Sequence, residues 1–428
     1  MADYIVEGGI PLYGDVRISG AKNSALPILA ATLLTKAEVV LHNCPDLTDV
    51  RATGKILSLF GCAVRREGDT VIVDSSHAAP CAVPEELMRE MRSSIIFLGA
   101  LLARFSSAYL SMPGGCELGP RPIDLHLSAL TCMGATIEND HGYLSCCADR
   151  GLRGTKITLS FPSVGATENT ILAAVTASGT TEIVNAACEP EIADLAGFLT
   201  ACGARISGAG TSRVVIEGVN TLHGCEYSVM PDRIEAATFL SATVLTGGNV
   251  TLCGVRNEDM EAVLAAYGEM GCQLRRYPGR LTAVMKGRPK KISQITTCPY
   301  PGFPTDAQAV LMAAACVADG TCVFVENIFE NRYKHVAGLL RMGADIRVIG
   351  KTAVVRGVNR LHAATVQSTD LRGGAALLTA ALSAEGTATV TEIHHILRGY
   401  EQPENKLNAL GARVRKNGSE NKRKDTVC

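Results

Sequence analysis

One short pattern recurs six times along the 428 residues and limits what the chain can fold into more than any other feature. In each copy an apolar residue is followed by Gly, by Ala or Cys, and then by a segment of alternating side chains. The glycines that mark the copies lie 68 to 73 residues apart: Gly61, Gly134, Gly203, Gly271, Gly343 and Gly411. Such a glycine is typical of a helix that ends in the left-handed region, and the alternation is typical of a strand. The pattern therefore predicts six copies of one α/β unit.

Each copy also contains a second helix that is apolar on nearly every face. These helices are predicted at residues 25–34, 95–103, 170–177, 236–245, 307–317 and 375–383. A helix without a polar face must be buried on all sides, and small residues let neighbouring helices approach closely. The strands that follow them are predicted at residues 38–41, 108–110, 181–184, 249–252, 322–325 and 387–390. We therefore expect helices inside and sheets outside, which reverses the usual layering of α/β proteins.

The chain is long enough for two domains, and six units divide as three plus three. Each unit reads as βαβαββ, so the predicted fold is α/β, with two similar domains that are each an inside-out barrel of three units. The first domain is expected at residues 22–229. The second is expected at residues 1–21 plus 230–418, with the N-terminal strand returning to it. Residues 419–428 are expected to form a flexible tail.

Composition and missing motifs argue against several kinds of partner. The net charge is −1, so no overall positive field exists to attract nucleic acid or an acidic membrane. Neither a P-loop nor a Gly-rich dinucleotide motif occurs, the sixteen cysteines include no Cys-x-x-Cys pair, and His394-His395 has no companion ligands at metal spacing. The N-terminal residues lack a secretory pattern, and the apolar stretches are shorter than a membrane span. We therefore expect a cytoplasmic protein with no metal, organic cofactor, nucleic acid, membrane or obligate protein partner.

The polar residues gather in loops that precede the buried helices or follow the next strand. The cations among them are Lys22, Arg92, Arg121, Arg332, Arg372 and Arg398. Helix N-termini add a positive dipole end, so pooling these loops in one cleft would suit a multiply charged anion. Each group also has a simpler interpretation. Asp232 and Asp370 are as well explained as N-caps, and an isolated arginine is usually solvated.

Cys116 is one cysteine among sixteen, which gives it little weight by itself. Its setting favours a functional role, because Pro113-Gly114-Gly115 indicates an exposed loop rather than a core strand. Nearby Arg121 would also favour the thiolate form of the side chain.

Several motifs resemble one enzyme family, the UDP-N-acetylglucosamine 1-carboxyvinyltransferases, from about residue 4 to about residue 415. The motifs are Lys22-Asn23, Pro113-Gly-Gly-Cys116, Arg121-Pro-Ile-Asp124, Ser163-Val-Gly-Ala-Thr167, Glu189-Pro-Glu191, Pro231-Asp-Arg-Ile-Glu235, Gly302-Phe-Pro-Thr-Asp306, Phe329-Glu-Asn-Arg332, Thr369-Asp-Leu-Arg372 and Arg398-Gly-Tyr400. The resemblance implies the enolpyruvyl transferase fold and transfer of the enolpyruvyl group of phosphoenolpyruvate to the 3-hydroxyl of UDP-N-acetylglucosamine. Phosphate would leave through a tetrahedral intermediate, without a cofactor. This is the first committed step of peptidoglycan synthesis.

The resemblance also implies roles for individual residues. Cys116 would protonate the methylene carbon, form a phosphoenolpyruvate adduct and be alkylated by fosfomycin, on a loop from about Ser111 to Arg121 that closes as a lid. Asp306 would accept the proton of the sugar hydroxyl. Lys22, Arg121 and Arg398 would hold phosphate and carboxylate, with Arg92, Arg332 and Arg372 adding positive charge. The nucleotide-sugar site would be lined by Asn23, Arg121, Pro122, Ile123, Asp124, Leu125, Phe161, Pro162, Ser163, Val164, Asp306 and Ile328.

The chain departs from the family pattern at a few positions, and other functions remain to be weighed. Leu397, Tyr300 and Gly373 stand where Asp, His and Ala are common, and Phe161-Pro162 is one of several family variants. None of these removes a catalytic group. The alternatives are the shikimate-pathway enolpyruvyl transferase of the same fold, RNA terminal-phosphate cyclase, and a non-catalytic paralogue that binds a UDP-sugar. The Pro-Gly-Gly-Cys loop argues against the shikimate-pathway enzyme. The missing nucleotidyl-transfer His motif argues against the cyclase. The intact Cys116, Asp306 and Arg398 argue against a non-catalytic paralogue.

Overall fold

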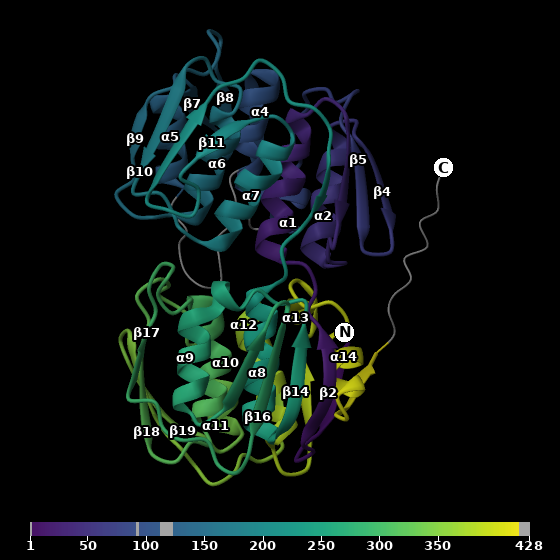
Figure 1. The fold of residues 1–428 in the computed structure, drawn as a ribbon, viewed down its shortest axis with the longest axis vertical. Coiled ribbons are helices and arrows are strands. Elements are labelled where there is room, and N and C mark those ends of the chain that lie inside the picture. Colours follow the sequence, from purple (N-terminus) through teal and green to yellow (C-terminus); the bar gives the residue numbers. More distant parts are fainter. Residues whose placement is uncertain (1, 91–93, 112–122, 419–428) are drawn as a thin grey trace. The chain divides into compact units, whose positions relative to one another are not determined.

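The computed structural model describes residues 2–90, 94–111 and 123–418. It divides into two compact units, which are described separately below (Figure 1). The first unit comprises Ser19–Asp232 with Pro299–Pro301, and the second comprises Met1–Ile18, Arg233–Cys298 and Gly302–Cys428. These boundaries lie three residues from those expected from the sequence, and the short segment Pro299–Pro301 was not expected to leave the second unit.

The first unit contains the first three repeats. The helices of this unit are α1 (Lys22–Ala31), η1 (Thr32–Leu34), α2 (Thr48–Leu59), α3 (Glu85–Glu90), η2 (Ser94–Ile96), α4 (Phe97–Phe105), α5 (Asp124–Cys132), α6 (Val164–Ala174) and α7 (Pro190–Ala201). The strands are β3 (Glu38–His42), β4 (Ala63–Glu67), β5 (Thr70–Asp74), β6 (Ser107–Ser111), β7 (Thr136–Asp140), β8 (Tyr143–Cys147), β9 (Lys156–Thr158), β10 (Thr180–Val184), β11 (Arg205–Ser207), β12 (Arg213–Glu217) and β13 (Glu226–Ser228).

The second unit contains the last three repeats and the two N-terminal strands, which pair in different sheets. The helices of this unit are α8 (Arg233–Thr246), η3 (Asn257–Met260), α9 (Glu261–Glu269), α10 (Thr305–Ala315), α11 (Val336–Arg341), α12 (Leu371–Ser383), α13 (His394–Leu397) and α14 (Pro403–Ala409). The strands are β1 (Asp3–Glu7), β2 (Leu12–Arg17), β14 (Gly248–Cys253), β15 (Gln273–Tyr277), β16 (Arg280–Met285), β17 (Gln294–Thr296), β18 (Thr321–Val325), β19 (Asp345–Ile349), β20 (Thr352–Arg356), β21 (Thr365–Gln367), β22 (Thr387–Thr391) and β23 (Arg413–Asn417).

The buried helices lie inside each unit, as the apolar pattern predicted. In the second unit α8, α10 and α12 pack against one another, and in the first unit α4 packs against α1 and α6 (Figure 1). Every residue of α10 from Ala307 to Ala315 is buried. The sheets cover these helices, and strands such as β18 and β20 alternate between buried and outward side chains. The fold is therefore the predicted inside-out α/β arrangement.

The repeat glycines have the predicted conformation. The φ angles of all six lie between 87° and 98°. In each copy the amide after the glycine donates to the carbonyl five residues earlier, as from Cys62 to Leu57 and from Ala344 to Leu339. This bond closes the helix and directs the chain into the next strand. The position suits glycine because a side chain there would be strained at positive φ.

Five of the six buried helices begin earlier than predicted, whereas α4 begins two residues later, directly after η2. Helix α6 starts at Val164 rather than at residue 170, and α12 starts at Leu371 rather than at residue 375. The sequence prediction placed each helix start at the beginning of the apolar run, which marks burial. The first turn lies before that run and carries polar residues, and a side chain at the N-cap accepts from its backbone amides. Ser163 accepts from the amide of Ala166, and Asp370 accepts from the amides of Arg372 and Gly373. Polar residues expected in loops therefore lie in the first turns of helices.

The repeats are not all self-contained in sequence. Among the described residues, only the third and fifth repeats build a four-stranded sheet from strands that are consecutive in the chain. The spatial orders of these sheets are β11-β12-β10-β9 and β17-β18-β20-β19. Strand β13 joins β3 in the first repeat, and β2 joins β14 in the fourth. Strand β1 lies between β22 and β23 of the sixth repeat. The second repeat has a three-stranded sheet, with a single bridge from Val83 to Leu110 where the other described repeats have a strand.

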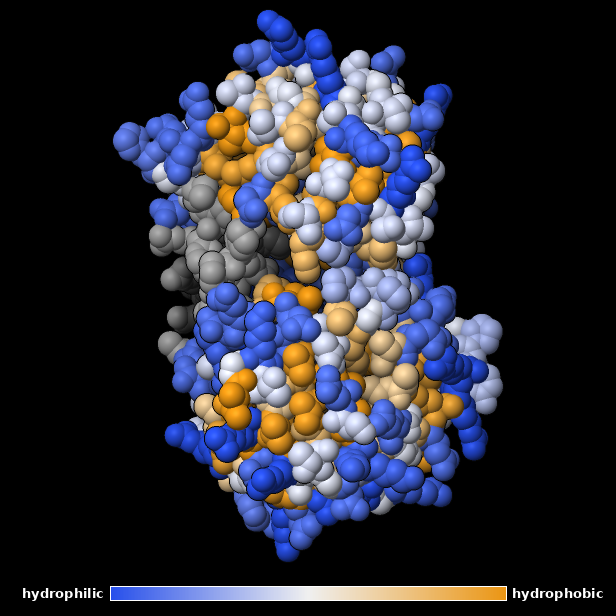
Figure 2. Space-filling view, turned by 90° about the vertical axis from the view of Figure 1, so that its left-hand side faces the viewer, coloured by the Kyte–Doolittle hydropathy of each residue, from blue (hydrophilic) through white to orange (hydrophobic). Residues whose placement is uncertain are grey.

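The outward faces of the sheets are mainly polar. Figure 2 shows hydrophilic residues distributed over both units, with hydrophobic patches between them. Strand β23, for example, reads Arg-Val-Arg-Lys-Asn, with only Val414 buried. No helix in the described part of the chain is long and apolar enough to cross a lipid bilayer.

Candidate active site

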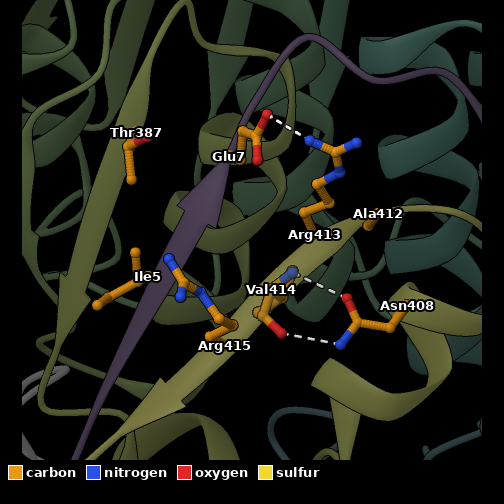
Figure 3. Close-up of a pocket in the computed structure, with 8 residues that line it drawn as sticks. All are labelled: Ile5, Glu7, Thr387, Asn408, Ala412, Arg413, Val414 and Arg415. Carbon is orange, nitrogen blue, oxygen red and sulfur yellow. Dashed lines mark hydrogen bonds and ion pairs between the residues drawn. The ribbon is translucent and has the colours of Figure 1, made fainter.

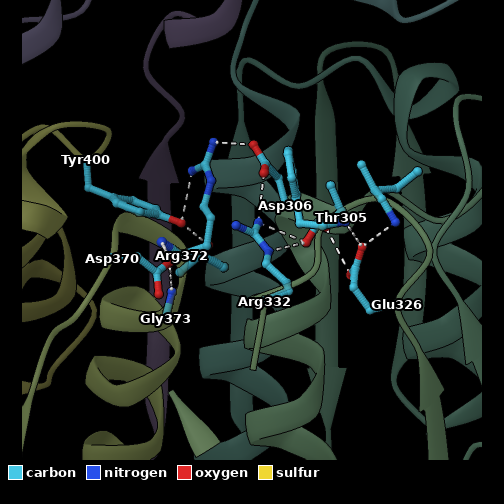
Figure 4. Close-up of polar contacts among 11 residues, drawn as sticks. Thr305, Asp306, Glu326, Arg332, Asp370, Arg372, Gly373 and Tyr400 are labelled. Carbon is cyan, nitrogen blue, oxygen red and sulfur yellow. Dashed lines mark hydrogen bonds and ion pairs between the residues drawn. The ribbon is translucent and has the colours of Figure 1, made fainter. Parts of the chain in front are cut away.

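A carboxylate held by two arginines lies in the second unit where the buried helices begin (Figure 4). Asp306, in the first turn of α10, accepts from Arg332 Nη2 at 2.8 Å and from Arg372 Nη2 at 3.0 Å. The arginine side chains are only 2% and 3% exposed, whereas that of Asp306 is 27% exposed. Solvent, or a ligand, therefore reaches the carboxylate more readily than the two cations that hold it.

Arg372 is fixed from several sides. Its backbone amide donates to the Asp370 carboxylate at 3.1 Å, which makes Asp370 the N-cap of α12. Its Nη1 donates to the Tyr400 hydroxyl at 3.3 Å, and that hydroxyl shares a 2.8 Å bond with Thr238 on α8. The cap interpretation of Asp370 is thus confirmed, and the cap sets the direction of the Arg372 side chain.

The other arginine is fixed by the backbone of Thr305. Arg332 donates to the Thr305 carbonyl from Nε at 3.3 Å and from Nη2 at 3.0 Å. Buried His335 lies one turn further along, and burial lowers the pKa of its imidazole to about 4. A neutral imidazole there adds no charge to the cluster, so the two arginines outnumber the single carboxylate between them.

Lys22 has its own buried partner in the first unit. Its Nζ lies 2.7 Å from Asp49 Oδ2, and the two side chains are 11% and 1% exposed. Asp49 is in the first turn of α2, and it was not among the residues singled out from the sequence. The backbone amide of Lys22 donates to the Asp232 carboxylate at 3.3 Å, so Asp232 satisfies the first amide of α1. The ammonium is therefore held at the start of α1 by a carboxylate from α2.

The segments expected to bind a nucleotide sugar come together in the first unit. His126, in α5, lies against Gly165 at the start of α6, and its Nδ1 lies 2.8 Å from Asn169 Nδ2. Burial lowers the pKa of His126 to about 4, so the ring is neutral and accepts from the amide. This contact joins α5, which begins at Asp124, to α6, whose N-cap is Ser163.

Burial raises the pKa of one carboxyl in α6. Glu168 is buried, and its pKa lies well above its usual range because burial, followed by the charges of Glu191 and Glu189, disfavours ionisation. Glu189 also accepts from the Tyr300 amide at 3.3 Å, so the segment with the Tyr300 departure contacts the Glu-Pro-Glu motif.

The remaining expected residues vary in exposure and position. Phe161 and Asp124 are exposed, whereas Asn23, Ile123, Leu125, Pro162, Ser163, Val164, Ile328 and Arg398 are half-buried. Arg398 ends α13. Four expected residues lie outside the described residues: Arg92, Cys116, Arg121 and Pro122. Their roles remain predictions of the sequence.

One surface hollow lies elsewhere and contains none of the expected residues. It measures about 350 Å³ and is lined by Ile5, Glu7, Thr387, Asn408, Ala412, Arg413, Val414 and Arg415 (Figure 3). Glu7 pairs with Arg413 at 2.8 Å. The Asn408 side chain donates to the Val414 carbonyl and accepts from the Val414 amide. These groups already bond to one another on the outside of a sheet, so the Asp306 cluster of the second unit and the Lys22 cluster of the first remain the candidate functional groups.

Comparison with known proteins decides the family. The model of the EPSP synthase (3-phosphoshikimate 1-carboxyvinyltransferase) family matches residues 6–407. UDP-N-acetylglucosamine 1-carboxyvinyltransferase from Nitratidesulfovibrio vulgaris is 49% identical and covers 97% of this chain and 99% of its own length. UDP-N-acetylglucosamine 1-carboxyvinyltransferase 1 from Symbiobacterium thermophilum is 51% identical, with coverage of 96% and 94%. The chain belongs to the UDP-N-acetylglucosamine 1-carboxyvinyltransferase family. The resemblance seen in the motifs is thereby confirmed.

Solved structures agree with this family and its fold. The enolpyruvyl transferase NikO from Streptomyces tendae superposes with a TM-score of 0.88 at 26% identity and covers 98% of this chain and 99% of its own. EPSP synthase from Acinetobacter baumannii gives a TM-score of 0.73 at 18% identity, covering 98% and 100%, and so shows the shared fold alone. Among the alternatives, the shikimate-pathway enzyme shares this fold, whereas the relatives that are about half identical are UDP-N-acetylglucosamine 1-carboxyvinyltransferases.

Proposed function

We propose that this chain transfers the enolpyruvyl group of phosphoenolpyruvate to the 3-hydroxyl of UDP-N-acetylglucosamine and releases phosphate. The observation that carries the proposal is the partly exposed Asp306 carboxylate between two buried arginines, in a chain 49% identical to a UDP-N-acetylglucosamine 1-carboxyvinyltransferase. A carboxylate serves as a proton acceptor and guanidinium groups bind phosphate and carboxylate, so the cluster supplies two of the functions that this reaction needs. The step commits precursors to peptidoglycan, and we place it in the cytoplasm.

The ion pairs explain how Asp306 could be kept inactive until substrate binds. Two guanidinium groups stabilise its charged form and make it a weak base. An incoming phosphate or carboxylate would compete for Arg332 and Arg372. Asp306 would then be free to accept the hydroxyl proton as the oxygen attacks C2 of phosphoenolpyruvate. The proton delivered to the methylene carbon would come from Cys116. As phosphate leaves C2 of the tetrahedral intermediate, the Cys116 thiolate would take a proton back from the resulting methyl group, which restores the double bond.

Lys22 would supply positive charge from the first unit. Its ammonium is paired with the Asp49 carboxylate, which an anionic substrate could replace as a partner. Arg121 and Arg398 complete the proposed anion site, with Arg92 adding to it. Asn23, the Ile123–Leu125 segment, the Phe161–Val164 loop and Ile328 are the proposed contacts of the nucleotide sugar.

Phosphate release measured with two acceptors tests the proposal. Phosphoenolpyruvate is supplied with UDP-N-acetylglucosamine and, separately, with shikimate 3-phosphate, and the expected result is release with the first acceptor alone. Asp306→Asn should lower kcat by about 10²- to 10⁴-fold, since the amide keeps the shape but cannot accept the proton. Asp345→Asn, on an exposed position of β19, is the matched control. Release with shikimate 3-phosphate alone would overturn the assignment of the acceptor.

A further inference from the structure

A second carboxylate lies beside the Asp306 cluster and is more deeply buried. Glu326 follows β18 directly and is 1% exposed. Within the described residues, no Lys, Arg or His side chain is within ion-pair distance of it. A buried carboxylate without a cation is costly unless hydrogen-bond donors surround it. The position of Glu326 therefore depends on the groups that donate to it.

The two oxygens of Glu326 hold two different segments of the chain (Figure 4). Oε1 accepts from the amides of Ile328 and Phe329 at 2.8 and 3.1 Å. Oε2 accepts from the Thr305 hydroxyl at 3.0 Å. The first segment leads to Arg332, and the second is the start of α10, where Asp306 follows. One side chain thus joins the two segments that carry the ion pair.

Thr305 connects this carboxylate to the reacting groups. Its hydroxyl is held by Glu326, and its carbonyl accepts from both Nε and Nη2 of Arg332. The helix has no side-chain cap at Pro304, which precedes Thr305. The contact with Glu326 therefore fixes the first residue of α10 where an ordinary N-cap is missing.

We propose that Glu326 is a positioning residue that acts through Thr305 to hold Asp306 and Arg332 in the geometry that proton transfer requires. This role rests on the function proposed above. A shift of about 1 Å in a reacting group can cost about a hundredfold in rate. Loss of the contact should therefore lower kcat more than it changes the KM for UDP-N-acetylglucosamine.

Variants of Thr305 test the contact without creating a buried hole. Thr305→Val removes the hydroxyl at constant size and should lower kcat about ten- to a hundredfold. Thr305→Ser keeps the hydroxyl and should restore kcat to within about threefold of the wild-type value. Thr321→Val, at the exposed first residue of β18, is the matched control and should leave kcat unchanged. Melting temperatures measured alongside show whether each variant is folded.

Glu326→Gln provides a readout that a purely structural role would not change. The glutamine can still accept from the two amides, but the negative charge near Asp306 is gone. Asp306 should therefore lose its proton more readily, and the acidic limb of the profile of kcat/KM against pH should move to lower pH. Thr305→Val keeps the charge and should leave this limb in place.

The outcomes separate the role of Glu326 from the proposed function. The double variant Glu326→Gln/Thr305→Val should be no slower than Thr305→Val, because Thr305→Val alone already breaks the connection between residues 305 and 326. Wild-type kcat in Thr305→Val, or an unmoved acidic limb in Glu326→Gln, would overturn the role of Glu326 while leaving the function intact. No phosphate release by the wild-type protein would overturn both.

Discussion

The ammonium of Lys22 depends on Asp49, which lies on a different helix. Because both side chains are buried, replacing Asp49 removes from Lys22 a compensating charge that water cannot readily supply. We predict that Asp49→Asn lowers the free energy of unfolding by about 3 kcal/mol, measured by urea denaturation. Glu38→Gln is the control, since it removes the exposed pair with Arg65, where N and O lie 3.2 Å apart. That change should stay within about 1 kcal/mol, and an equal loss in both variants would contradict the argument from burial.

The buried histidine of α5 makes stability depend on pH. Burial lowers the pKa of His126 to about 4, from an ordinary value near 6.5. Between these values the unfolded chain takes up a proton that the folded chain does not, so the free energy of unfolding falls as the pH drops from about 6.5 to about 4. The fall contributed by this group approaches about 3 kcal/mol.

His126→Asn tests this dependence, because asparagine can accept from Asn169 without titrating. We expect a flatter curve of unfolding free energy between pH 7 and pH 4.5 for this variant. His141→Asn is the control, since that side chain is 99% exposed and its backbone φ of 49° suits asparagine. Identical slopes for His126→Asn and the wild type would show that the ring is not kept neutral by burial.

Single residues also show where inference from the sequence stops. The expected cations and Asp306 stood out because polar residues interrupt apolar runs, and the structure joins Asp306 to Arg332 and Arg372. The residues that hold these groups in place are harder to recognise in the sequence. Asp49 and Glu326 look like ordinary carboxylates after a turn or a strand, and only the folded chain shows what they hold. The pattern of a sequence marks exposure and period, whereas these partners are set by contacts between distant segments.

At the scale of helices and strands, the period of the sequence predicted the types of element better than their connections. Burial on every face followed from the apolar runs, and the left-handed helix ends followed from the glycines. The sequence did not predict that β2 pairs with β14 of the fourth repeat and that β13 pairs with β3 of the first. A strand has the same alternation of side chains whichever neighbour it pairs with. Helix starts were also placed late, because apolar residues begin one turn after the cap.

The close approach of α4 and α6 leads to a prediction about two glycines. Gly99 donates its amide to Asn169 Oδ1 at 2.7 Å, and a methyl group at Gly99 would overlap the Asn169 carbonyl oxygen. We expect Gly99→Ala to lower the free energy of unfolding by about 1–3 kcal/mol. Gly268, in α9, has open space around the same position, so Gly268→Ala should raise stability by up to about 1 kcal/mol. Chemical denaturation of both variants should give opposite signs, and a loss in both would show that helix contact is not the cause.

On the scale of the whole molecule, the two N-terminal strands determine which pieces of chain can fold. All strands of the first unit come from Ser19–Asp232, whereas the second unit needs β1 and β2 from the beginning of the chain. Strand β1 is internal to its sheet, with β22 on one side and β23 on the other. A fragment that starts at Arg233 would therefore have a gap in one sheet and a missing edge strand in another.

This connectivity predicts that the second unit can be made from one rearranged chain. Asp3 lies opposite Asn417 in the antiparallel pair of β1 and β23, so a two-residue Asn-Gly turn after residue 417 can lead directly into residue 3. We expect the chain 233–417, Asn-Gly, 3–18 to unfold cooperatively, measured by circular dichroism during heating. The chain 233–418 alone should melt without a cooperative transition, because the backbone groups of β22 and β23 that pair with β1 would be left unpaired. A control with the residues of 3–18 in scrambled order should behave like the shorter chain. Cooperative unfolding of 233–418 itself would show that the two N-terminal strands add to the second unit without being required for it.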